Sequence, residues 1–146
     1  MAQYENVLVA IDGSTESQKI IQKALDVVAG TSAKVSVVVV FEDLLNTYTY
    51  ELNMGDFEKA QKEFQSAYTV QVKAMIDEKF PSIGAEAVHF LHGKAGDEIK
   101  KLAKDSGADL IVLGSHGQGA IKSALLGSTA NAVLHGSHCD VFTVRV

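Results

Sequence analysis

Five short apolar runs divide this chain, and stretches with helical spacing lie between them. Within the first four runs nearly every position is apolar, which is typical of strands covered on both faces of a parallel sheet. The runs predict strands at residues 7–11, 35–41, 85–91, 108–113 and 141–146. The last run, from Val141 to Val146, alternates apolar and polar residues, which indicates a less covered strand at a sheet edge.

Helices are predicted between the strands because apolar residues there recur every three or four positions. The first helix is capped by Ser14 or Thr15 and ends at Gly30. A longer helix extends from Asp56 to about Lys79 and stops before the only proline. Its predicted apolar face comprises Phe57, Ala60, Phe64, Ala67, Tyr68 and Met75.

Two shorter helices follow in the second half of the chain. One covers residues 96–106, and the apolar positions of the other are Leu126, Ala130, Val133, Leu134 and Ser137. Residues 42–55, before the long helix, show no sustained periodicity, and an irregular segment of this length is typical of functional loops.

The regular alternation of strands and helices predicts an α/β fold. Right-handed crossovers turn this order into an open, doubly wound, five-stranded parallel sheet with helices on both faces. At 146 residues the chain is long enough for one domain with a substantial core, so residues 1–146 are expected to form a single domain.

The amino-acid composition argues against several classes of binding partner and cellular location. The formal net charge of −5 and scattered basic residues argue against nucleic-acid binding. No window approaches about 18 consecutive apolar residues, and the N-terminus lacks the pattern of a signal peptide, so we expect a cytoplasmic protein without a membrane segment. Cys139 is the only cysteine, which excludes an intrachain disulfide.

The candidate chemistry lies in a glycine motif after the fourth strand. Gly114-Ser115-His116-Gly117 is followed by nine residues and then by Gly127-Ser128 at the predicted start of the last helix. Glycine can take positive φ and lets backbone N–H groups approach a bound anion. A helix N-terminus adds unpaired donors and a favourable dipole, so phosphate is the expected anion.

Two better-known phosphate motifs are absent. A Walker loop requires Lys-Ser or Lys-Thr directly after its last glycine, whereas Ala120-Ile121 follows Gly119. The dinucleotide fingerprint requires a third glycine where Lys122 stands, which argues against a nicotinamide cofactor.

The position of the motif suggests a nucleotide site. Ligands of doubly wound sheets bind beyond the carboxyl ends of the strands, where the helices switch faces. Asp12 ends the first strand and Gly114 ends the fourth, so a switch between these strands would bring the two together, although sequence order alone does not establish it. Glycine amides and Ser128 would hold phosphates and Asp12 sugar hydroxyls, while valine-rich strand ends would meet the base. Asp12 can also form an Asx turn, and Ser128 can cap the helix.

No metal site is predicted. His135 and His138 are three residues apart but lack a third ligand, and His89 and His92 would point to opposite faces of a continued strand. A divalent ion such as Mg²⁺ or Mn²⁺ would instead be carried by the phosphates of a nucleotide.

The string GSHGQGAIKSALLGST, with VAIDGS near the start and residues 139–145 at the end, resembles the ATP-binding branch of the universal stress protein family over essentially the whole chain. The resemblance implies a Rossmann-like sheet similar to that of adenine nucleotide alpha hydrolases, with strand order 3-2-1-4-5. It further implies ATP between the first and fourth strands and a homodimer through the last strand. Gly93-Lys94-Ala95 and Asp140 depart from the family, since proline is common at both places.

Carried over position by position, the resemblance assigns adenosine to residues at strand ends: Ala10, Ile11, Asp12, Val40, Leu113 and Gly114. It assigns the phosphates to the glycine motif: Gly117, Gly127, Ser128 and Thr129.

These residues support a nucleotide-dependent regulator of the stress response as the first hypothesis. The alternative is a slow ATP hydrolase or nucleotidyl transferase that uses the same site, because phosphate binding alone does not separate a binder from a catalyst. The motif supplies no evident general base, and no catalytic residue is assigned. A third hypothesis is a flavodoxin-like interaction module that binds no nucleotide.

Overall fold

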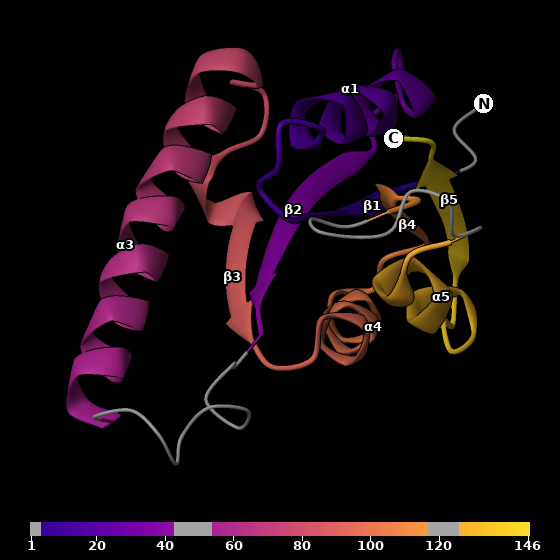
Figure 1. Ribbon diagram of the computed structural model, residues 1–146. Coiled ribbons are helices and arrows are strands. Elements are labelled where there is room, and N and C mark those ends of the chain that lie inside the picture. The colour runs from indigo at the N-terminus through magenta and orange to yellow at the C-terminus, as the bar shows by residue number, and fades with distance from the viewer. Residues whose placement is uncertain (1–3, 43–53, 117–125) are drawn as a thin grey trace.

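The five predicted strands form one sheet. The computed structural model describes residues 4–42, 54–116 and 126–146, with side chains in the long helix from residue 58 onward. The elements are β1 (Asn6–Ile11), α1 (Ser17–Val27), β2 (Lys34–Phe41), α3 (Met54–Lys79), a 3-10 turn (Ala85–Ala87), β3 (Val88–His92), α4 (Ala95–Ser106), β4 (Leu110–Gly114), α5 (Ser128–Leu134) and β5 (Asp140–Val144). The order is β3-β2-β1-β4-β5 and every pair is parallel, which confirms the predicted topology (Figure 1).

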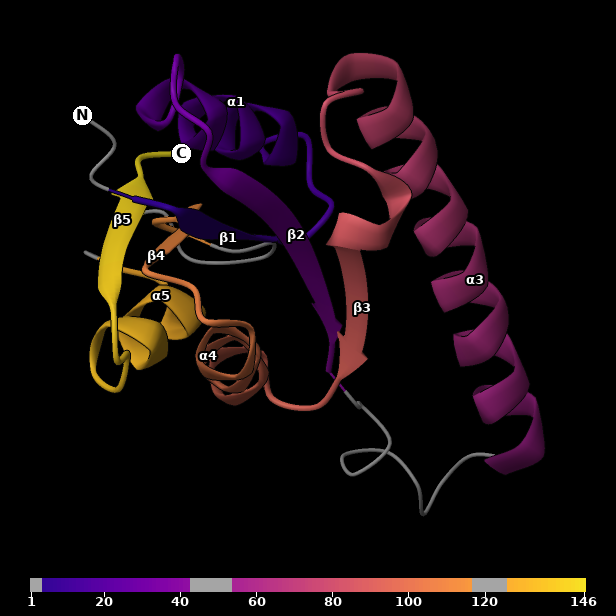
Figure 2. The ribbon, with the colours of Figure 1, turned by 180° about the vertical axis from the view of Figure 1, so that it is seen from behind.

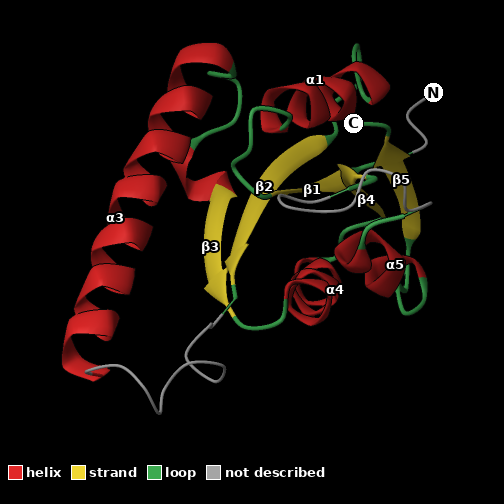
Figure 3. Cartoon of the chain, in the orientation of Figure 1, coloured by secondary structure: helices red, strands yellow, loops and turns green. Residues whose placement is uncertain are grey.

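Helices cover both faces of this sheet. α1 and α3 lie on one face, and α4 and α5 lie on the other (Figure 3). Successive residues of β1 serve the two cores in turn, since Val9 packs with the first pair of helices and Leu8 with the second. This two-sided burial is the reason that the central strands β1 and β4 are continuously apolar rather than alternating.

Several element boundaries differ from the predicted ones. The third strand begins at Val88, because Ala85–Ala87 form a 3-10 turn in which the amide of Ala87 donates to the carbonyl of Gly84 at 2.9 Å. The last helix begins at Ser128 and ends at Leu134, so Leu126 and Ser137 lie outside it. The long helix begins at Met54, inside the segment predicted to be irregular, whose residues 43–53 are not among those described.

The face that α3 turns toward the sheet is the main correction to the predicted helices. Val72 and Ile76 are buried in the core, as an inward face requires. Phe64, however, is 67% exposed, and Ala60 and Ala67 are also exposed. The predicted apolar face is therefore wrong at Ala60, Phe64 and Ala67, because the inward row that leads back from Val72 passes through Thr69, Gln65 and Gln61. α3 lies beside the edge strand β3 in both views (Figures 1 and 2).

None of the helices in the described parts of the chain is long and apolar enough to span a bilayer.

Gly96 allows the close approach of α4 and α5. A Cβ built on Gly96 would lie 2.7 Å from the Cβ of Ala132. Two carbon atoms that are not bonded to each other cannot lie this close, so one of the helices would have to shift. Overpacking costs about 1–3 kcal/mol, whereas alanine in a helix gains about 0.5–1 kcal/mol over glycine. We therefore expect Gly96→Ala to lower the free energy of unfolding by about 1 kcal/mol, measured by chemical denaturation.

Gly136→Ala is the matched control. Its Cβ would meet the Nζ atom of Lys100 at 2.6 Å, and this flexible side-chain end can move away. The control should be as stable as the wild type within about 0.5 kcal/mol. A Gly96→Ala protein with unchanged stability would show that the two helices are not in close contact.

Candidate functional site

β1 and β4 are neighbours, which settles the adjacency that sequence order left open. Ala10 lies opposite Leu113 in the parallel register, so Asp12 and Gly114 follow at the same carboxyl edge. The helix after β1 packs on one face of the sheet, and the helix after β4 packs on the other. The chain therefore switches faces between these two strands, where ligands of such sheets bind.

Asp12 begins a tight turn after β1. The amide of Ser14 donates to Oδ1 of Asp12 at 2.9 Å, and Gly13 has φ +77°. The Asx turn considered from the sequence is thus present. It uses one carboxylate oxygen, and an ionised carboxylate has a second oxygen that accepts hydrogen bonds. The turn and a contact to sugar hydroxyls are therefore compatible roles for Asp12.

Tyr68 reaches this turn from α3. Its hydroxyl donates to the backbone carbonyl of Asp12, and its ring packs edge-on against Phe41 at 5.7 Å. Burial raises the pKa of Tyr68 to about 12, with a further contribution from the negative charge of Asp12. The sequence indicated only that Tyr68 lies on an apolar helix face. Its contact with Asp12 had no signal in the sequence because 56 residues separate the two.

Ser115 joins the two halves of the glycine motif. Its amide donates to the carbonyl of Val144 at 2.8 Å, and its carbonyl accepts from the amide of Gly127 at 2.7 Å. Its Oγ accepts from the amide of Val146 at 3.3 Å. Ser115 is buried. Its role was not predicted, because the only signal in the sequence is a polar residue that directly follows an apolar strand.

The hydrogen bond from the amide of Gly127 to the carbonyl of Ser115 limits which groups of the motif could bind an anion. Because its N–H group is already used, the donors left at the start of α5 are the first N–H groups of the helix itself. Ser128 is exposed and Thr129 is half-buried in this first turn. Gly117, the remaining predicted phosphate residue, lies outside the described residues.

Neither Gly114 nor Gly127 adopts a positive φ. Gly127 has φ −69° and ψ 160°, and Gly114 is not among the described glycines with positive φ. A Cβ on Gly114 would lie 2.9 Å from Cδ1 of Ile20. Positive φ is therefore not what these two positions use, and Gly114 packs closely against α1.

The apolar residues predicted to contact adenosine divide between the two faces. Ala10, Val40 and Leu113 belong to the core on the side of α4 and α5. Ile11 belongs to the core on the other side. Since Leu113 and Ile11 are both buried, their side chains serve the core, and a ligand at this edge would meet their backbone.

Within the described ranges, no group of three or more histidine, cysteine, aspartate or glutamate side chains is placed to hold a metal ion. His116 belongs to the glycine motif, and its Nδ1 atom lies 3.2 Å from Oγ of Ser115.

Fold and site together define a doubly wound α/β protein whose candidate ligand edge lies between β1 and β4. The sequence profile of the universal stress protein family matches residues 3–145. The chain belongs to this family.

Relatives match over nearly the full chain. Universal stress protein A homolog 1 of Coxiella burnetii is 36% identical over 145 residues, which cover 97% of this chain and 96% of the relative. The structure of the universal stress protein UspA from Lactobacillus plantarum superposes with a TM-score of 0.78 at 22% identity, covering 99% of this chain and 100% of that one. A universal stress protein in complex with cAMP has a TM-score of 0.58 at 24% identity, covering 99% and 98%.

The hydrogen bond from Tyr68 to the carbonyl of Asp12 should stabilise the folded state to a degree that depends on pH. Tyr68→Phe should lower the free energy of unfolding by about 0.5–1.5 kcal/mol at pH 8, because it removes one hydrogen bond. The pKa of Tyr68 is raised in the folded state, to about 12 from an unfolded value of 10.0. The wild-type advantage should therefore be complete below pH 10 and disappear as the pH rises toward 12, measured by chemical denaturation at each pH.

Tyr4→Phe is the matched control. Tyr4 donates to Oδ2 of Asp140 at 2.8 Å, away from the Asp12 turn. In an absorbance titration of tyrosinate, Tyr68→Phe should remove a component that Tyr4→Phe leaves in place. A titration in which both variants lose the same component would contradict the contact between Tyr68 and Asp12.

Proposed function

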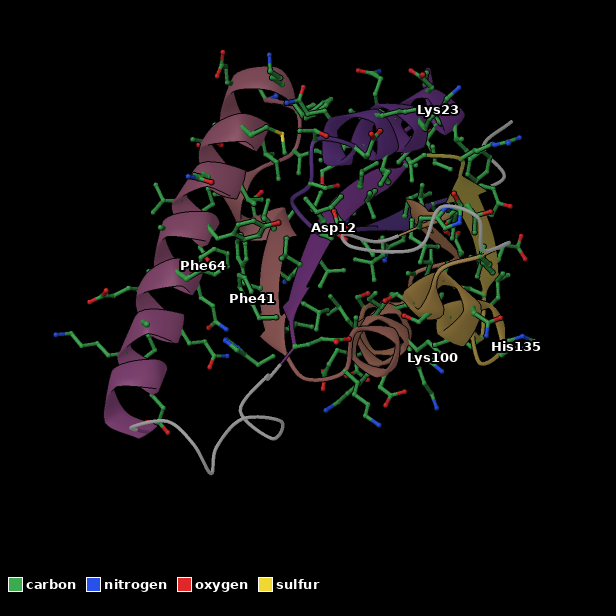
Figure 4. The ribbon with its side chains drawn as sticks, viewed as in Figure 1. Asp12, Lys23, Phe41, Phe64, Lys100 and His135 are labelled. Atoms are coloured by element: carbon green, nitrogen blue, oxygen red, sulfur yellow. The ribbon has the colours of Figure 1, made fainter. Side chains whose placement is uncertain are left out.

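We propose that this protein binds ATP between β1 and β4 and acts as a nucleotide-dependent regulator of the stress response. The observation that carries the proposal is the meeting of the Asp12 turn with both described parts of the glycine motif at one sheet edge. Figure 4 shows Asp12 at this edge. A carboxylate for sugar hydroxyls and backbone donors for phosphates then face one ligand.

The residues present fit a nucleotide. Val40 is half-buried on the face of α4 and α5, which offers apolar surface to a base next to Ala10. Ser128 and Thr129 present hydroxyl groups and helix N–H groups to phosphates. Mg²⁺ or Mn²⁺ would enter with the phosphates, which supply most of its oxygen ligands.

The cAMP complex of a structural neighbour supports this choice of ligand class. Its ligand contains adenine, ribose and phosphate, the three groups that we assign here to Val40, Asp12 and the start of α5. Competition between ATP and cAMP for this chain separates a preference for the triphosphate from a general affinity for adenosine phosphates.

We assign holding of ATP rather than its hydrolysis. Asp12 is the carboxylate at this edge, and we place it at the sugar, where it cannot activate water toward the phosphates.

We also propose a cytoplasmic protein that forms a homodimer through β5. β5 is an edge strand, and Phe142 on it is 39% exposed. An unpaired edge strand is a ready template for pairing with a second copy.

Gly127→Val tests ATP binding. The backbone of Gly127, at φ −69° and ψ 160°, suits valine, so the substitution adds an isopropyl group at the motif without backbone strain. We expect saturable binding of labelled ATP to the wild type and a dissociation constant at least about tenfold higher for the variant, or about 1.4 kcal/mol. Equilibrium dialysis measures both.

Gly136→Val is the matched control at the other end of α5 and should bind ATP like the wild type. The three described atoms nearest to its added Cβ all belong to the movable side chain of Lys100. Absence of saturable binding to the wild type, or equal affinity in Gly127→Val, would contradict the site. Single-turnover conversion of bound ATP that Asp12→Ala abolishes would favour the hydrolase instead.

Phe142→Lys tests the homodimer. Lysine on an exposed edge strand opposes pairing with an identical strand through charge repulsion. We expect the wild type to sediment as a dimer and the variant to shift to monomer, with a dimer dissociation constant raised at least about tenfold. Analytical ultracentrifugation over a concentration series measures this constant.

Val70→Lys is the matched control on α3, beside the opposite edge of the sheet. Val70 is 66% exposed, so it also places lysine on an apolar surface position. It should leave the dimer intact. A wild type that remains monomeric at all concentrations, or a Val70→Lys protein that dissociates instead, would contradict an interface at β5.

A further inference from the structure

A second cavity lies on the opposite side of the sheet from the proposed nucleotide site. It has a volume of about 790 Å³ and is bounded by α3 and by the ends of β2 and β3. β2 separates the two sites. Its residue Val40 packs on the face of α4 and α5, whereas the next residue, Phe41, packs on the face of α3. A volume of this size is typical of small-molecule sites.

The floor of the cavity is aromatic. Phe41 and Phe90 are neighbours on β2 and β3, with ring centroids 6.2 Å apart and ring planes 15° from parallel. The ring of His92 lies 5.6 Å from that of Phe41. Three rings at adjacent strand ends therefore give a surface on which a flat molecule can stack. Figure 4 shows Phe41 beside α3.

The wall that faces this floor is polar. Its α3 residues include Gln61, Gln65 and Thr69, which continue the inward face of Val72 at helical spacing. Oε1 of Gln65 lies 2.9 Å from Nε2 of His92, which leaves the amide NH₂ of Gln65 with two donors. α3 thus turns amide and hydroxyl groups toward aromatic rings.

The charges at the cavity balance. Glu58 and Lys62 are one helical turn apart among the lining residues. The lining residues themselves therefore favour neither an anion nor a cation, while outside the lining Nζ of Lys73 lies over the Phe90 ring, 5.7 Å from its centroid. The lining supplies stacking surface on one side and hydrogen-bonding groups on the other.

This polarity is the reverse of what simple packing would produce. A helix that only covered a sheet would bury Phe64 and expose its glutamines. Here Phe64 is 67% exposed, while Gln61 and Gln65 are partly buried above the rings. A ligand with flat faces and a polar rim would satisfy both surfaces of the cavity at once.

We propose that the cavity between α3 and the ends of β2 and β3 is a second ligand site, which binds a flat, uncharged heteroaromatic compound with hydrogen-bonding groups on its rim. The faces of the ligand stack on Phe41 and Phe90, and its rim bonds to Gln65 and Thr69. The site is distinct in place from the proposed nucleotide site because it lies on the other face of β2.

A titration monitored by ¹H–¹⁵N NMR tests the site on the full chain, with benzimidazole, 7-azaindole and quinazolin-4-one as separate probes. We expect at least one probe to cause saturable shifts of the amides of Phe41, Phe90 and His92. Saturating ATP should not displace the probe, whether or not ATP itself binds.

Gln65→Trp should fill the cavity and weaken probe binding at least tenfold. Ser66→Trp, at an exposed position of the same lining, is a second variant that should block the cavity. It is less able to disturb the fold because Ser66 is exposed. Gln71→Trp places the same ring on an exposed position outside the lining and should bind like the wild type. The spectra themselves report whether each variant is folded.

Three results would overturn the proposal. The first is the absence of saturable shifts for all three probes. The second is a set of shifts centred on Asp12, Gly114 and Gly127, which would assign the probes to the edge between β1 and β4. The third is equal affinity of folded Gln65→Trp or Ser66→Trp and the wild type.

Discussion

The parallel pairing of β1 with β4 is the contact on which the rest of this structure depends. β1 lies at the middle of the sheet, and all its residues after Asn6 are buried. Because the helices that follow β1 and β4 pack on opposite faces, the carboxyl edge stays accessible between these strands. Asp12 and the glycine motif come from distant parts of the sequence and meet there.

A buried serine organises this edge further. Ser115 binds Val144 at the end of β5 through its amide and Val146, just after this strand, through its Oγ, and it binds the start of α5 through its carbonyl. The strand that we propose as the dimer contact is therefore bonded to the motif that we propose as the phosphate site. A change at one of them has a direct physical route to the other, through the hydrogen bonds of one residue.

α3 has two functions along one face. Its second half buries Val72 and Ile76 in the core, and this packing sets the rotation of the whole helix. In its first half the same rotation directs glutamines toward the rings of Phe41 and Phe90. Tyr68 lies between the halves and bonds to the carbonyl of Asp12. The helix thus contributes to the nucleotide edge and bounds the second cavity.

The sequence by itself determined the strands, most of the helices and the α/β class, because continuous and 3.6-residue apolar patterns follow from local burial. It located Asp12 and Gly114 at strand ends, and the family resemblance supplied the strand order. The structure confirms the pairing of β1 with β4 that this order implies. Tertiary structure alone decided that Ser115 joins the motif and that α3 faces the sheet with glutamines. An apolar period defines a face but not its partner, and these contacts join residues far apart in the chain.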